Sequence, residues 1–260
     1  MKTTLLFLSV FLSANLFGQN VYIPDANFKA YLVSNSAINT NSDTEIQLSE
    51  ASAFTGTIDC NGQNIYDLTG IEAFTALTYL YCHNNYLTSL NVSSNTALET
   101  LHCSENQIPS LDISSNTALI LLNCQGNQIG SLDLSNSTAL EAIYCGLNQL
   151  TSLDLSSNTS LTFLDCFGNQ LTSLDVSNNT SLGLMGCGSN QLASLDVSNN
   201  VVLAALVCEN NQLECLNFKN GNNTLLVTFA ASGNPNLTCI EVDDVNYSTA
   251  NWSSIDPWSY

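Results

Sequence analysis

The chain has few positive charges. Its 260 residues include no arginine and three lysines, against 22 aspartates and glutamates, so the formal net charge is −19 at pH 7. A chain of this charge repels phosphate backbones and anionic membrane surfaces. We therefore expect no nucleic-acid partner and no membrane surface as a ligand.

Motifs of common enzymes are also missing. The sequence has no G-x-S-x-G, no H-E-x-x-H and no phosphate-binding loop, and each of these spacings brings a nucleophile, a metal or a phosphate into reach of its partner groups. Paired acidic residues occur, but the repeat described below accounts for them. The sequence therefore predicts a protein that is not an enzyme and needs no cofactor.

Long apolar runs are scarce. An apolar stretch over residues 5–12 follows Lys2 and is too short to span a bilayer comfortably, which is typical of a signal peptide. We interpret residues 1–19 as that signal. We expect a secreted or cell-surface protein without membrane insertion, and no lipid anchor, because no cysteine precedes Cys60.

The chain is built from repeats. Cysteines recur every 21 residues from Cys82 to Cys208, and Cys60 lies 22 residues before the first of them. Each belongs to the phrase L-x-x-L-x-C-x-x-N-x-L-x-x-L-D/N-V/L/I-S-x-N-T-x. Its L-x-L and L-x-C pieces alternate with the period of a strand and leave no room for a long helix. We predict a β-rich solenoid: a right-handed stack of about nine coils, with a main parallel sheet, a second face of short strands or extended segments, and few helices.

The ends of such a stack need caps, because a single coil cannot bury enough surface to fold alone. Residues 20–54 form the predicted amino-terminal cap, in which Asp25 begins a short helix and Phe28 and Leu32 cover the first coil. Residues 55–225 are the repeats. Residues 226–260 are a last degenerate coil and the carboxy-terminal cap, with Trp252 and Trp258 available to close the stack.

Two kinds of side chain recur at inward positions. Stacked carboxamides can satisfy the backbone groups of a turning chain, and buried cysteine behaves as a small hydrophobe with a raised pKa. We expect both sets to be structural and the thiols to stay reduced. The cysteine ladder comprises Cys60, Cys82, Cys103, Cys124, Cys145, Cys166, Cys187 and Cys208. The first asparagine column comprises Asn85, Asn106, Asn127, Asn148, Asn169, Asn190 and Asn211. The second asparagine column comprises Asn95, Asn116, Asn158, Asn179 and Asn200, with Ser137.

Two further cysteines lie outside the ladder. Cys215 and Cys239 take the outward x of L-x-x-L in successive coils at the end of the stack. A disulfide there would join the last coil to its neighbour. We predict that bridge, and no metal site along the ladder, because the repeat supplies no second soft ligand per coil.

The sheet face, meaning the outward side chains of the main sheet, is the predicted binding surface. It carries more aromatic and aliphatic area than a solvated sheet needs, although β-propensity alone is the other explanation. The candidates are Tyr79, Tyr81, His83, His102, Glu105, Asn123, Tyr144, Phe163, Asp165 and Phe167. The two histidines and Glu105 could suggest zinc, but we expect their rings to be offset and interpret them as surface residues.

An aspartate column also recurs once per coil, on the second face: Asp112, Asp133, Asp154, Asp175 and Asp196. Stacked carboxylates repel, which would raise their pKa values or attract cations such as Ca²⁺. The interpretation that we favour is that each aspartate accepts hydrogen bonds within its own D-x-S-x-N turn.

The repeats resemble those of leucine-rich repeat proteins, in particular the short bacterial class with nested L-x-x-L-x-L-x-x-N-x-L-x-x-L-D-L phrases, called IRREKO repeats. Cysteine in the sixth position and an ending such as "NPNLTCIEVDDVNYSTANWSSID" (234–256) are similar to secreted Bacteroidetes proteins. The resemblance implies adhesion or surface interaction with a protein or glycan. A structural spacer without its own ligand is the alternative.

Overall fold

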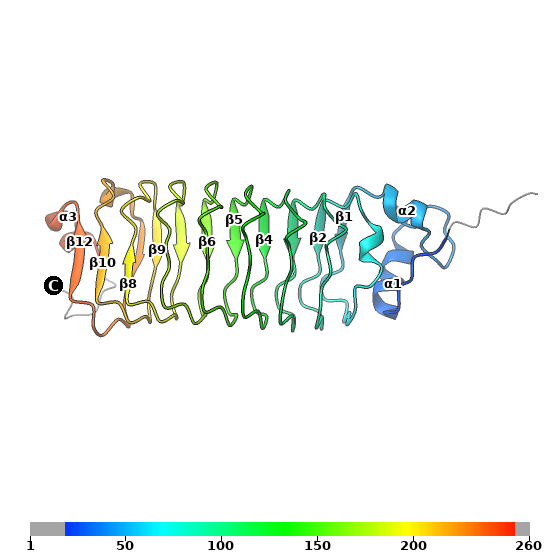
Figure 1. Cartoon of the computed structure of the whole chain (residues 1–260), viewed down its shortest axis with the longest axis horizontal. Coiled ribbons are helices and arrows are strands. Elements are labelled where there is room, and N and C mark those ends of the chain that lie inside the picture. Colours follow the sequence, from blue (N-terminus) through cyan, green and yellow to red (C-terminus); the bar gives the residue numbers. More distant parts are fainter. Residues whose placement is uncertain (1–18, 253–260) are drawn as a thin grey trace, which may run out of the picture.

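The structure is a computed structural model that describes residues 19–252. The proposed signal peptide therefore lies almost wholly outside the described residues, and Trp258 lies outside them too. The described chain forms an elongated stack of coils with helices at its two ends (Figure 1).

The main sheet has nine short parallel strands in the order β1-β2-β3-β4-β5-β6-β7-β9-β11. Their registers advance by one repeat per strand, as in the pairing of Leu101 with Leu122 and of Leu122 with Ile143. The predicted parallel solenoid of about nine coils is confirmed. The strands are β1 (Thr57–Asp59), β2 (Tyr79–Tyr81), β3 (Thr100–His102), β4 (Leu121–Asn123), β5 (Ala142–Tyr144), β6 (Phe163–Asp165), β7 (Leu184–Gly186), β9 (Ala205–Val207) and β11 (Thr228–Ala230).

The second face forms a true sheet only near the carboxy-terminal end. There β8 (Ser194–Asp196), β10 (Cys215–Phe218) and β12 (Cys239–Val242) pair in parallel. Closer to the amino terminus, one isolated parallel bridge joins Asn91 to Asp112. Of the two predicted alternatives for the second face, short strands therefore occur near the carboxy-terminal end, and extended segments occur over the rest of the described stack.

The core is a continuous column of apolar side chains between the two faces. The middle residue of each main strand points inward, and all eight ladder cysteines are completely buried. A parallel sheet places like residue over like at a spacing of about 4.8 Å. Each inward side chain therefore packs against its own equivalents in the coils above and below.

The first asparagine column ties neighbouring coils together, as predicted. In coil after coil the side-chain nitrogen donates to two cysteine carbonyls, one in its own coil and one in the coil before. For Asn148 the acceptors are Cys145 (3.1 Å) and Cys124 (3.0 Å). Its Oδ1 accepts the backbone N–H of Ile129 (3.0 Å). Each carboxamide thus satisfies buried backbone groups in two successive coils.

The second asparagine column differs from the first, because its side chains donate hydrogen bonds and accept none. Asn158 Nδ2 donates to the backbone oxygens of Leu134 (3.2 Å) and Ser137 (2.9 Å). Its Oδ1 is buried without a partner, as is the Oδ1 of every other asparagine in this column. Both carbonyls already accept a backbone N–H, from Ser137 and from Leu140. The column therefore adds a second donor to groups that are already paired.

Caps close both ends of the stack. Helix α1 (Ala26–Ser34) begins at Asp25, whose carboxylate accepts from the backbone N–H groups of Asn27 and Phe28, and it buries Phe28 and Leu32. Helix α2 (Leu48–Ala53) and the 3-10 turn η1 (Ile71–Ala73) complete this end. At the other end, the turn η2 (Asn223–Leu225) and helix α3 (Val245–Asn251) precede Trp252. The Trp252 ring packs on Phe218 and Phe229 at centroid distances of 5.4 and 4.7 Å.

Candidate binding surface

The sheet face brings the predicted binding residues together in two outward columns. Tyr79 shares a column with Phe163, and Tyr81 shares a column with His102, Asn123, Tyr144 and Asp165. The third outward row, just past the strands, carries His83 and Phe167, and Glu105 follows it. All the predicted residues therefore lie on one side of the solenoid.

Aromatic and aliphatic side chains cluster in the middle of the sheet face. The rings of Tyr144 and Phe163 stack with centroids 4.4 Å apart and planes at 28°. Phe163 pairs in register with Ala142 and not with Tyr144, so the two stacked rings are diagonal neighbours. Nearby, Leu147 is 46% exposed, Leu184 44% and Phe167 40%. An exposed apolar cluster of this kind is typical of a contact surface.

The two histidines stack on each other, which corrects the expectation that their rings are offset. The ring centroids of His83 and His102 are 4.0 Å apart, with planes at 11°. His102 ends β3 and pairs with Tyr81, and His83 lies two residues past Tyr81, just beyond β2. A diagonal neighbour of this kind is within reach of a ring. His102 Nε2 and Ser104 Oγ form a hydrogen bond of 2.8 Å, which restrains the orientation of the His102 ring.

The stack affects protonation and metal binding. Burial, followed by repulsion from His83, lowers the pKa of His102 to about 4. Parallel rings direct their in-plane lone pairs alongside each other rather than toward one ion, so this pair is a poor zinc ligand.

The sheet face is bordered by acidic groups. Glu99 accepts a hydrogen bond from Tyr79 at 2.8 Å, and Glu105, Glu141 and Glu209 lie beside the main strands. The two lysines of the described chain are at its ends, where Lys29 pairs with Glu45 (2.6 Å) and Lys219 with Glu241 (2.9 Å). Within residues 19–252, the sheet face therefore carries negative charge and aromatic area but no cation.

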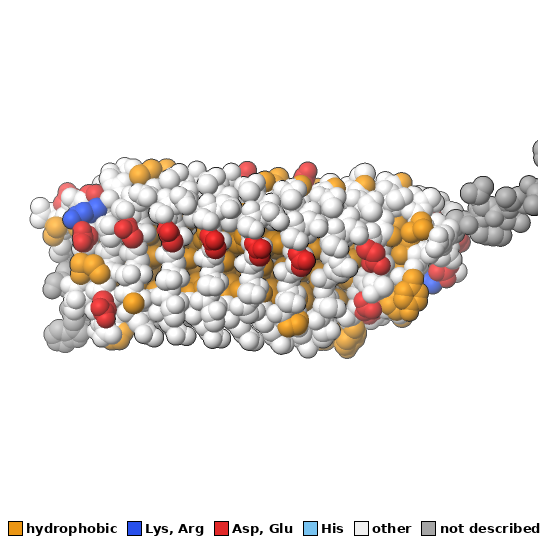
Figure 2. Space-filling model, in the orientation of Figure 1, with side chains coloured by type: hydrophobic (Ala, Val, Ile, Leu, Met, Phe, Trp, Pro, Cys, Tyr) orange, Lys and Arg blue, Asp and Glu red, His pale blue; other side chains and the backbone are white. Residues whose placement is uncertain are grey.

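The aspartate column runs along the second face, where Figure 2 shows a row of evenly spaced acidic side chains. Each of the five accepts the backbone N–H of the serine two residues later at 2.9 Å. Hydrogen bonds from the serine hydroxyl and backbone lower each pKa below its usual value. The prediction that these carboxylates bond within their own turns is confirmed. Repulsion between neighbouring aspartates raises the pKa values of Asp112, Asp154 and Asp175 by less than the serine hydrogen bonds lower them.

The ladder thiols are expected to be unreactive because they are completely buried. Burial raises the pKa of Cys60, Cys124 and Cys208 to about 12 and raises those of the other five well above the usual value. All eight are free cysteines. A thiol that does not ionise at neutral pH is a poor nucleophile and a poor metal ligand.

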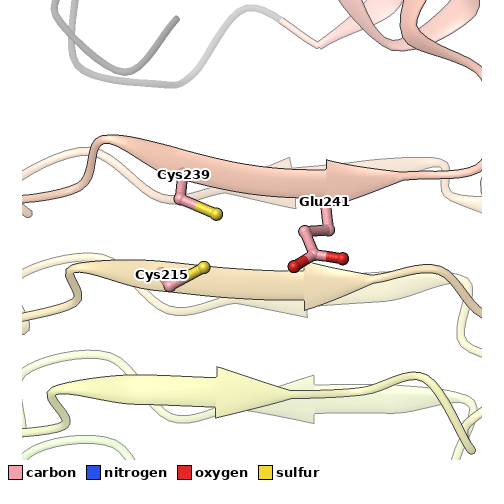
Figure 3. A group of neighbouring side chains, drawn as sticks. All are labelled: Cys215, Cys239 and Glu241. Carbon is pink, nitrogen blue, oxygen red and sulfur yellow. The ribbon is translucent and has the colours of Figure 1, made fainter.

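Cys215 and Cys239 lie directly opposite each other on β10 and β12. Both are free and partly exposed, and their sulfurs approach each other beside Glu241 (Figure 3). The ligand atoms of the three residues lie within 4.8 Å of one another, so this group could also hold a soft metal ion. In-register parallel strands separate Cα atoms by about 4.8 Å, which is within the range that disulfides span. The bridge between them remains a prediction.

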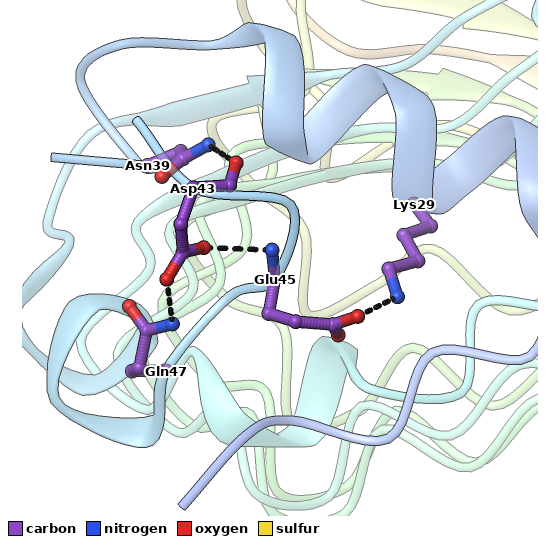
Figure 4. Close-up of polar contacts among 5 residues, drawn as sticks. All are labelled: Lys29, Asn39, Asp43, Glu45 and Gln47. Atoms are coloured by element: carbon purple, nitrogen blue, oxygen red, sulfur yellow. Dashed lines mark hydrogen bonds and ion pairs between the residues drawn. The ribbon is translucent and has the colours of Figure 1, made fainter. Parts of the chain in front are cut away.

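A polar loop in the amino-terminal cap was missed in the sequence analysis. Around the segment between α1 and α2, Asn39 Nδ2 donates to the backbone oxygen of Asp43 (2.8 Å) and Gln47 Nε2 donates to Asp43 Oδ2 (2.9 Å), as Figure 4 shows. Asn41 Nδ2 donates to Gln47 Oε1 (2.7 Å), and Glu50 Oε1 accepts the backbone N–H of Asn41 (3.3 Å). The sequence signal of this loop is the spacing N-x-N-x-D followed by Glu50. The repeat period does not extend over residues 39–50, so it does not predict this network.

Comparisons with known proteins address the fold. No protein-family model matches the chain. A segment of 77 residues is 35% identical to internalin J of Listeria monocytogenes (serotype 4b, strain F2365), and it covers 29% of this chain and only 8% of that protein. The solved structure of internalin C2 from the same strain matches with a TM-score of 0.64 at 20% identity, over 89% of this chain and 91% of that one.

A leucine-rich repeat protein of Leptospira interrogans gives a TM-score of 0.57 at 20% identity, over 72% of this chain and 47% of that one. The fold is that of the leucine-rich repeat proteins. At these identities, the structural likeness establishes the fold and leaves the partner open. No helix within residues 19–252 is both long and apolar enough to cross a membrane.

Proposed function

We propose that this leucine-rich repeat protein is a secreted or cell-surface binding module that uses its sheet face to contact a protein partner, in adhesion or another surface interaction, without catalysis. The observation that supports the proposal is the apolar cluster around the stacked rings of Tyr144 and Phe163. Solenoids of this kind present long surfaces on which few exposed aromatic anchors supply most of the binding energy.

The acidic border specifies the chemistry of that partner. Glu105, Glu141 and Asp165 lie around the aromatic cluster, and the described part of the sheet face has no cation to oppose them. A partner surface with lysine or arginine side chains beside an apolar patch would match both features, because cations interact well with carboxylates and with aromatic rings.

A triple variant tests the surface. Tyr81→Ala, Tyr144→Ala and Phe163→Ala together remove aromatic side chains from the sheet face, and all three are half-buried and not in the core. The bait is the purified protein, used to capture partners from its native surroundings, and the affinity for a captured partner is then measured. Loss of such anchors should weaken the binding free energy by at least about 2 kcal/mol, which is roughly a thirtyfold loss of affinity.

The chain offers a matched control. Tyr66 and Tyr86 are exposed, stack at a centroid distance of 4.9 Å and lie outside the main strands. The variant with Tyr66→Ala and Tyr86→Ala should bind like the unchanged protein. A spacer without its own ligand predicts no saturable binding by any of the proteins. Capture of a glycan would show that the partner is a glycan and not a protein. Equal binding by the triple variant and the control variant would show that the binding site is not on the sheet face.

A further inference from the structure

The polar loop between α1 and α2 has the composition of a cation site. Side-chain oxygens occur at Asn39, Asn41 and Asp43, that is, at every second residue, and the carboxylate of Glu50 follows seven residues later. In calcium loops of the helix-loop-helix type, oxygen ligands come from loop positions 1, 3, 5 and 7, with a carboxylate at position 12. Counting from Asn39, the carboxylates of Asp43 and Glu50 fall at positions 5 and 12.

The surrounding structure fits this spacing. The loop joins two helices, α1 and α2, and Ile46 at position 8 is completely buried. The backbone oxygen of Ile46 accepts the N–H of Val21 (2.8 Å), which fastens the middle of the loop to the chain that precedes α1. The side chain of Glu45 at position 7 turns away to pair with Lys29 (2.6 Å), so its contribution to a site would be the backbone oxygen.

Asn39 supplies an independent observation. Its side chain is 3% exposed, and its Nδ2 donates to the backbone oxygens of Val33 (2.9 Å) and Asp43 (2.8 Å). These two bonds identify the nitrogen and fix the amide group against the backbone of Val33 and Asp43. The remaining atom, Oδ1, is buried and has no hydrogen-bond partner.

That oxygen differs from the other unpaired carboxamide oxygens of the described chain. The others belong to the second asparagine column, inside the repeats. Asn39 instead begins a segment that contains three carboxylates, those of Asp43, Glu45 and Glu50. A hard cation can supply the missing interaction to an unpaired buried oxygen in a segment that also carries carboxylates.

We propose that residues 39–50 bind one Ca²⁺ ion, with side-chain oxygens of Asn39, Asn41, Asp43 and Glu50 and the backbone oxygen of Glu45 as ligands. This site is independent of the sheet face and of the aspartate column. The carboxylates of Asp43 and Glu50 accept hydrogen bonds from Gln47 Nε2 (2.9 Å) and from the backbone N–H of Thr40 (2.8 Å), and the ion would replace part of this bonding. The ion would hold α1 and α2 together and stiffen the cap over the first coil.

The loop departs from the calcium pattern at two points, and both predict weak binding. Asparagine replaces aspartate at position 1, which removes one charge. Thr44 stands at position 6 in place of glycine, and the left-handed turn residue is Ser42 (φ 59°) instead. Affinity in such loops follows ligand charge and rigidity, and extracellular modules bind at a Kd of about 10⁻⁴–10⁻³ M. We expect this range.

The test uses the full chain, stripped of metal with a chelator. Calorimetric titration with CaCl₂ should give one site per chain, and the melting temperature should rise with Ca²⁺. Mg²⁺ at the same concentration should have a much smaller effect, because it tolerates irregular oxygen sites poorly. Equal shifts with both ions would attribute the effect to screening of the negative charge and overturn the site.

Three variants make the result specific. Asn41→Asp adds a carboxylate at position 3, where the side chain is exposed, and should tighten Ca²⁺ binding by about tenfold or more, a gain that loss of folding cannot imitate. Glu50→Gln should abolish the titration. Asp154→Asn in the aspartate column removes an equal charge elsewhere and should leave the affinity unchanged. Absence of binding in both the unchanged protein and the Asn41→Asp variant would refute the proposal. So would loss of binding in Asp154→Asn together with unchanged binding in Glu50→Gln.

Discussion

Replacement of Asn148 by alanine tests whether the first asparagine column holds the coils together. The substitution removes the acceptor of the Ile129 N–H and the donor to the carbonyls of Cys124 and Cys145. The matched change in the second column is Asn158→Ala, which removes a donor to Leu134 and Ser137 and an oxygen that has no partner. Both variants lose the same atoms from buried sites, so the cavity contribution is similar.

The bonding partners set the magnitudes. After Asn148→Ala, Cys124 and Cys145 keep donors from Asn127 and Asn169, but the Ile129 N–H is left unpaired. A buried unpaired group costs about 1–3 kcal/mol and each lost bond about 0.5–1.5 kcal/mol, so the sum is about 2–6 kcal/mol.

The second column should be more tolerant. After Asn158→Ala, both carbonyls keep their backbone partners, and removal of an unpaired oxygen offsets part of the loss. We expect about 0–2 kcal/mol. The chain itself has a serine, Ser137, at one position of this column, which agrees with a small cost.

Urea unfolding followed by far-ultraviolet circular dichroism measures both variants. Comparison of free energies requires equal m-values, because a repeat array can lose cooperativity when one coil is weakened. Asn136→Ala is the surface control, since this exposed side chain makes one long bond to Ser114 (3.3 Å). If Asn158→Ala destabilises the protein as much as Asn148→Ala, then the first asparagine column does not stabilise the stack through the Ile129 N–H and the cysteine carbonyls.

Two further predictions concern thiols and histidine. Non-reducing mass analysis of the denatured protein should find Cys215 linked to Cys239 and eight free thiols, and the native protein should react very slowly with thiol reagents because burial raises the ladder pKa values; bridges within the ladder would contradict this. The pKa of His102 is lowered to about 4 in the folded state, so between that value and its unfolded value of about 6.5 the unfolded chain binds more protons and stability falls as the pH falls. His102→Gln should flatten the dependence of the melting temperature on pH in that window, and an unchanged slope would contradict the assignment.

Periodicity made the repeat architecture predictable. The L-x-x-L-x-C phrase predicts inward and outward residues because a strand alternates sides, and the burial of Leu101 and Cys103 and the exposure of Tyr79 follow from it. The first asparagine column was predictable for a similar reason, since a fixed spacing in a stacked coil places like over like. The same spacing identified the turn bonds of Asp154.

Other features depended on contacts that no repeat encodes. The stacking of His83 on His102 arises from a diagonal contact and a bond to Ser104, and residue spacing gave the opposite expectation. Likewise, the unpaired oxygen of Asn39 depends on where its nitrogen finds acceptors.

The sequence by itself determined the coil, the count of coils and the side of each residue, because these follow from a local period that every repeat obeys. The tertiary structure decided which outward rings meet, where the second face becomes a sheet and which buried polar atoms lack partners. Those outcomes depend on side-chain directions and on neighbours from other coils, and a one-dimensional period contains no information on either.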